Sequence, residues 1–129
     1  MSLAIGDLMP HFRANDLAGR AFVYTDAAWQ RRNLVLVRLP AEPSEADARY
    51  LAALAARAAA FEASTAVVLV TRDPIDGIPG AGVVVADRWG EIFHVAHAAD
   101  AASLPSADAL IEWVDFVQRQ CGGCRAEAR

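Results

Sequence analysis

Runs of apolar residues along the chain predict strands that are buried on both faces. Three such runs are rich in valine, leucine and alanine and lie at residues 34–39, 65–71 and 82–86. Shorter alternating patterns predict a hairpin over residues 11–26, in which Phe22 to Tyr24 form the second strand, and a further strand over residues 91–97.

Two segments have the spacing of amphipathic helices. The first runs from Ser44 to Phe61, with Ser44 as a helix N-cap and Asp47 in the first turn. Its apolar positions are Tyr50, Leu51, Leu54, Ala58 and Phe61. The second begins after Ser106, and its apolar face is Leu110, Ile111, Val114 and Val117.

The order of these elements predicts an α/β fold with a central mixed β-sheet flanked by helices. A strand–helix–strand unit favours a parallel pair, and the closing hairpin adds antiparallel strands. A length of 129 residues fits one domain, 1–129. Within it we expect an N-terminal hairpin extension (1–33), a core (34–120) and a C-terminal tail (121–129) that carries Cys121-Gly-Gly-Cys124.

Composition and charge exclude several classes of protein. A hydrophobic content of 55% argues against disorder, and a net charge of −4 argues against a nucleic-acid partner. No apolar run reaches the ~18 residues of a membrane span, so we expect no membrane association. The first ten residues have no basic segment followed by an apolar one, which predicts a cytoplasmic protein.

Three local motifs, in this order, give the chain a family resemblance. They are Ile5-Gly6-Asp7-x-x-Pro10-x-Phe12 followed by Asp16-Leu17-x-Gly19-Arg20, then Ile75-x-Gly77-Ile78-Pro79, and then Asp87-Arg88-Trp89-Gly90-Glu91-Ile92. Together they resemble the thioredoxin-like fold and, within it, the peroxiredoxin-like (AhpC/TSA) group, over nearly the whole chain. The resemblance implies a thioredoxin-like sheet with an N-terminal β-hairpin, and a redox cysteine at the start of the helix after the first central strand.

The sequence departs from this family at the expected active site. Alignment on the strand at 34–39 places Ser44 and Asp47 where the family has its cysteines, and no cysteine precedes Cys121. We interpret Ser44 as an N-cap; the alternative is a hydroxyl that stabilises a bound thiolate, as in glutathione transferases. Pro79 falls at the family's cis-proline position, and the sequence leaves cis and trans open.

Cys121 and Cys124 have the spacing both of redox pairs and of half a zinc site. They allow three interpretations: an incidental pair, a zinc site and a redox pair. His94 and His97 are candidates for completing a zinc site, but residues three apart on a strand point to opposite faces, so a second chain is the alternative source of ligands. A redox role requires the tail to be mobile, or to dock on the Ser44–Pro79 face of its own chain or of a partner chain.

These observations predict a non-catalytic or redox-degenerate binding protein, with Ser44, Asp47 and Pro79 as its degenerate family site. The expected partner is a protein or a thiol-containing ligand, with a homodimer as a further expectation and with no cofactor apart from the zinc alternative. One alternative is a thiol-disulfide oxidoreductase or peroxidase that uses Cys121 and Cys124. The other is a zinc-binding or dimerising module.

Overall fold

A computed structural model describes residues 3–75, 77–78 and 80–121 of the chain. Its strands are β1 (Arg13–Asp16), β2 (Ala21–Val23), β3 (Asn33–Arg38), β4 (Ala66–Thr71), β5 (Ala81–Ala86) and β6 (Ile92–Ala98). Its helices are α1 (Tyr24–Ala27), α2 (Glu45–Ala55), α3 (Ala58–Ala63), the short 3₁₀ helix η1 (Ala101–Ser103) and α4 (Ala107–Cys121).

The strands form one mixed sheet in the order β2-β1-β4-β3-β5-β6. β3 and β4 are parallel, as the strand–helix–strand pattern predicts, and the register pairs Arg38 with Thr71 at their carboxyl ends. β5 runs antiparallel to β3 and to β6. β1 pairs antiparallel with β4, so the N-terminal hairpin belongs to the same sheet as the central strands. The predicted central mixed β-sheet is confirmed.

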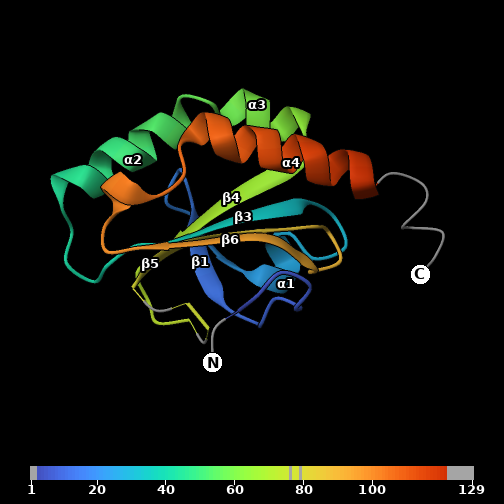
Figure 1. The fold of residues 1–129 in the computed structure, drawn as a ribbon, viewed down its shortest axis with the longest axis horizontal. Helices are drawn as coiled ribbons and strands as arrows, with labels where there is room; N and C mark the ends of the chain where they lie inside the picture. The colour runs from blue at the N-terminus through green and yellow to red at the C-terminus, as the bar shows by residue number, and fades with distance from the viewer. Residues whose placement is uncertain (1–2, 76, 79, 122–129) are drawn as a thin grey trace.

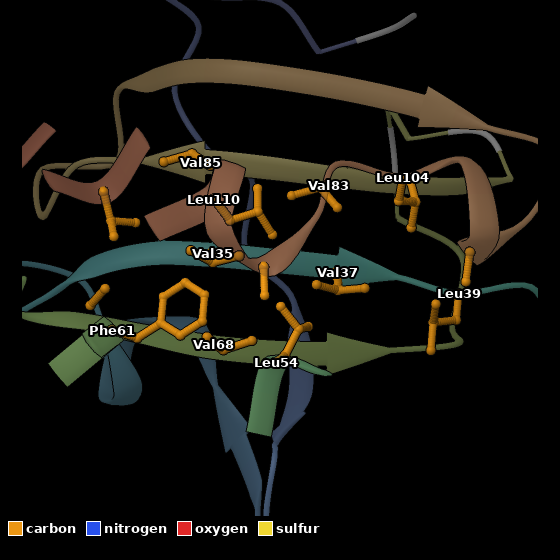
Figure 2. Packing of buried hydrophobic residues seen from close by; sticks show 14 of the residues in the cluster. Val35, Val37, Leu39, Leu54, Phe61, Val68, Val83, Val85, Leu104 and Leu110 are labelled. Atoms are coloured by element: carbon orange, nitrogen blue, oxygen red, sulfur yellow. The ribbon is translucent and has the colours of Figure 1, made fainter. Parts of the chain in front are cut away.

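Helices α2, α3 and α4 cover one face of the sheet, and α1 lies on the other (Figure 1). Side chains alternate between these two layers along β3. Val35 and Val37 point towards the three helices, where Leu54, Phe61 and Leu110 meet them (Figure 2). Leu34 and Leu36 point to the other face of the sheet, where they pack in a second core cluster with Phe12 and Tyr24. Burial on both faces explains why the central strands are continuous apolar runs.

The segment from Ser44 to Phe61 forms two helices, and the prediction of one continuous helix is wrong. The backbone N–H of Arg57 bonds to Leu54, three residues back, and Arg57 leaves the helical conformation (φ −111°, ψ 20°). The alanines between Leu54 and Phe61 bury little area, so packing of these two side chains directs the path. Ala58, predicted on the apolar face, is exposed.

Tyr24 begins helix α1 and does not continue the second strand of the hairpin as predicted. Tyr24 is 4% exposed, and its ring stacks on Phe12 with a centroid distance of 5.0 Å. A helical turn directly after Val23 brings Tyr24 into the core, and a four-residue turn has no periodicity from which to predict it.

The last helix matches its prediction. Ser106 caps it by accepting a hydrogen bond from the Ala109 backbone N–H at 3.2 Å. Leu110, Val114 and Val117 are fully buried against the sheet. Among the described residues, no helix is both long enough and apolar enough to span a membrane.

Replacement of Leu54 by alanine is expected to lower the free energy of unfolding by about 2–5 kcal/mol, because Leu54 is fully buried between α2 and the sheet. The matched control is Leu8→Ala, since Leu8 is 68% exposed, and its effect should stay within about 0.5 kcal/mol. Urea unfolding followed by circular dichroism measures both. Equal effects of the two substitutions would contradict the packing of α2 on the sheet.

Candidate functional site

The start of α2, where the family resemblance expects a redox cysteine, is a capped helix end. Ser44 is exposed and extended, and its side-chain oxygen accepts a hydrogen bond from the Asp47 backbone N–H at 3.2 Å. The prediction of Ser44 as an N-cap is confirmed. The serine hydroxyl therefore satisfies one of the free N–H groups of the first turn.

Asp47 lies in this same turn and forms a buried ion pair. The residue is 1% exposed, and its Oδ2 accepts a hydrogen bond from Nη1 of Arg72 at 2.6 Å. The same Nη1 donates to the Pro40 carbonyl at 2.7 Å. The pair joins the residue after β4 to the first turn of α2. We call this arrangement of Ser44, Asp47, Arg72 and Pro40 the α2 corner.

The α2 corner holds no group with the chemistry of a thiolate. A serine hydroxyl needs a general base to become a nucleophile, and the neighbouring carboxylate of Asp47 is engaged by a guanidinium. A carboxylate has no sulfur with which to reduce a peroxide or exchange with a disulfide. What the corner supplies is electrostatic: a fixed anion and a cation that is one-third exposed (32%).

Arg72 is the site residue that sequence reasoning missed. It directly follows a buried strand that lies parallel to the strand before Ser44. The carboxyl ends of parallel neighbours meet at one edge of a sheet, which is where ligand sites of α/β proteins form. Applied to the position of Arg72 directly after a predicted strand, this rule could have identified Arg72 as a site residue from the sequence.

An open groove of about 750 Å³ adjoins the α2 corner. The hairpin β1–β2 lines it together with Leu51 of α2 and residues 70–73. Arg72 belongs both to this groove and to the ion pair with Asp47. Sequence analysis did not predict the groove.

Of the remaining predicted site residues, Pro79 and Cys124 lie outside the described residues, and Cys121 is the last residue of α4. Gln118, one turn earlier, accepts a hydrogen bond from Asn33 at 2.8 Å, so this end of α4 lies at the start of β3. Figure 1 shows the end of α4 and the beginning of α2 on opposite sides of the molecule.

Asp47 lies beyond the other end of β3, a six-residue strand that spans about 17 Å at ~3.3 Å per residue. The end of α4 and the α2 corner therefore lie at opposite ends of a central strand.

His94 and His97 point to opposite faces of the sheet, as predicted. His94 stacks on Trp113 of α4 with a centroid distance of 4.5 Å. His97 is exposed and lies opposite Gly82, on the other face. Within the described ranges, no three histidine, cysteine, aspartate or glutamate side chains gather as a metal site.

Three solved structures show the same fold as this chain. They are the reduced 2-Cys peroxiredoxin of Plasmodium vivax (TM-score 0.71, 15% identity, 92% of this chain and 83% of that one), AhpC of Mycobacterium tuberculosis (0.71, 14%, 98% and 99%) and the yeast mitochondrial 1-Cys peroxiredoxin (0.70, 13%, 92% and 78%). No protein-family model matches the sequence, and no curated protein matches it.

These similarities establish the thioredoxin-like fold in the form that peroxiredoxins have. The identities, between 13% and 15%, show the fold alone and carry no chemistry over to this chain.

Removal of either partner of the Asp47–Arg72 pair should destabilise the fold, and by unequal amounts. Arg72→Ala leaves an unpaired carboxylate at a position 1% exposed, and we expect a loss of about 3 kcal/mol. Asp47→Ala leaves a guanidinium that can turn to water, with a loss of about 1–2 kcal/mol. Arg49→Ala, which breaks the exposed pair with Glu45, is the control at about 0.5 kcal/mol or less. Urea unfolding that finds Asp47→Ala the more damaging would contradict the buried carboxylate.

The stack of His94 on Trp113 predicts a loss of stability in acid. Burial lowers the pKa of His94 below its ordinary 6.5, since the charged ring is poorly solvated there. The folded state therefore favours the neutral ring; this contribution is complete above pH 6.5 and is lost as pH falls through the folded pKa. His94→Phe keeps the stack and should flatten the dependence of unfolding free energy on pH below 6.5. A ring titration by NMR with a midpoint at or above 6.5 would contradict this assignment.

Proposed function

We propose that this chain is a binding protein on a peroxiredoxin-type thioredoxin fold that has no thiol chemistry at the α2 corner. The observation that carries the proposal is the buried Asp47–Arg72 ion pair, with a distance of 2.6 Å, at the start of the helix after a central strand. The family resemblance places the redox cysteine at this point. A paired carboxylate occupies it here, and the serine beside it caps the helix.

The geometry of the corner supports binding in preference to catalysis. The first-turn N–H groups and dipole of a helix stabilise an anion, and in a redox enzyme that anion is the attacking thiolate. Here the anion is the Asp47 carboxylate, which is already neutralised by Arg72. The adjoining groove, of about 750 Å³, is within the size range of pockets that hold small organic ligands.

The test is a peroxidase assay with hydrogen peroxide and dithiothreitol. We expect the purified protein to give no turnover above that of the Cys121→Ser/Cys124→Ser variant. Turnover that this variant loses would contradict the proposal and favour the oxidoreductase alternative at the cysteine pair. Turnover that the variant keeps would contradict the proposal at the α2 corner itself. The zinc alternative stays a prediction, and metal content measured on the same sample tests it.

A variant that introduces a thiol at position 47 tests the electrostatics of the α2 corner. Asp47→Cys, in the background without Cys121 and Cys124, puts a single thiol on the helix end beside Arg72. Both surroundings favour a thiolate, so the ultraviolet absorbance of the thiolate, followed against pH, should give a thiol pKa below the ~8.5 of free cysteine. An ordinary value would mean that the corner does not have the electrostatics that the proposal assigns to it.

A further inference from the structure

The groove beside the α2 corner has an apolar middle. It is lined by Leu17, Leu51 and Val70. All three side chains are half-buried and pack against the hydrophobic core between the sheet and helices α2, α3 and α4. Leu51 comes from α2, Val70 from β4 and Leu17 from the turn after β1. A ligand that covers these side chains removes apolar surface from water, which favours binding of an apolar body.

One end of the groove presents Arg72 with unused donors. Both of its contacts in the described part of the chain, to Asp47 and to the Pro40 carbonyl, use the same nitrogen, Nη1. A guanidinium has five N–H donors in a planar fork, and Nε and Nη2 form the edge that binds a carboxylate through two parallel hydrogen bonds. The ion pair with Asp47 thus fixes Arg72 and leaves this edge for a ligand.

A second guanidinium lies at the same end. The paired stretch of β1 and β4 ends at Asn15 and Val70, and Arg13 and Arg72 each lie two residues beyond this end of the ladder. Arg13 is exposed, lines the groove and forms no ion pair with any described residue. Two guanidiniums that line one groove repel each other, so an anion between them would be stabilised.

Two carboxylates also line the groove. Asp26 on α1 and Asp73 after β4 both line the groove, are exposed and form no ion pair within the described ranges. The backbone of Asp73 is held in place, because its N–H donates to Thr71 Oγ1 at 3.0 Å and its carbonyl accepts from Arg38 Nε at 3.3 Å. Charges of both signs therefore lie unpaired beside an apolar surface.

We propose that the groove binds a short apolar peptide or amino acid with a free carboxylate and a free ammonium group. The carboxylate lies between Arg72 and Arg13, the ammonium group faces Asp73 and Asp26, and the apolar side chains cover Leu51 and its neighbours. This inference deepens the proposed binding function and rests on it. The class of ligand follows from the side chains of the groove, which combine charges of both signs with an apolar surface.

The probe is the dipeptide leucyl-leucine, titrated into the full-length protein and followed by NMR at the methyl groups of Leu51 and Val70. N-acetyl-leucyl-leucine lacks the ammonium charge, and leucyl-leucine amide lacks the carboxylate. We expect each capped form to bind about tenfold more weakly than the free dipeptide, as expected for the loss of a charged hydrogen bond.

Two variants assign the charges, and neither disturbs the Asp47–Arg72 pair. Arg13→Gln should reduce the preference for the free dipeptide over its amide, since it removes one of the two guanidiniums that bind the carboxylate and leaves Arg72 in place. Asp73→Asn should correspondingly reduce the preference over the N-acetyl form. Arg49→Gln, on the part of α2 outside the groove, is the control and should keep both preferences.

Two results would overturn the inference: no saturable shift at Leu51 and Val70 up to about 10 mM dipeptide, or equal affinity for the free and capped forms. Either result leaves the peroxidase assay untouched, so the failure of this inference is separate from the failure of the proposed function. Peroxidase turnover, conversely, would contradict the proposed function without changing the dipeptide titration.

Discussion

The central strands of this molecule have to be covered on both faces, and most of the fold follows from that requirement. Residues 34–37 of β3 and 83–86 of β5 are completely buried, so the chain must supply two layers around them. Helices α2, α3 and α4 form one layer. The second consists of α1, Phe12 and the N-terminal segment, which is tied to the start of β6 through hydrogen bonds from Gly6 to Ile92 and from Met9 to Gly90.

This constraint also explains which parts of the fold the sequence predicts. An apolar run that must be buried on both faces is visible in any window, so β3, β4 and β5 lie within one residue of their expected positions. Helix α1 and the break at Arg57 were missed because both lie in short or alanine-rich segments. There, packing of Tyr24 and Phe61 decides the path, and local preference does not.

The same distinction between local and long-range contacts applies to the candidate site. Ser44 was predictable as a cap because capping depends on residue type and on a contact three residues away. The Asp47–Arg72 pair joins residues 25 positions apart and depends on the parallel register of β3 and β4. The groove depends on a further long-range contact, the pairing of the N-terminal hairpin with β4, which extends the sheet beside α2. No local sequence pattern predicts the register of this pairing.

Under the proposed function, a carboxylate lies at the α2 corner where the family resemblance implies a thiolate, and this difference is physically conservative in one respect. A helix N-terminus stabilises an anion whether it is a thiolate or a carboxylate, so Asp47 supplies the charge that the position favours without thiol chemistry. The carboxylate also holds Arg72 in a fixed ion pair. The helix end thus supports a guanidinium at the end of a groove. Asp47 then contributes to ligand binding by positioning Arg72, without touching the ligand.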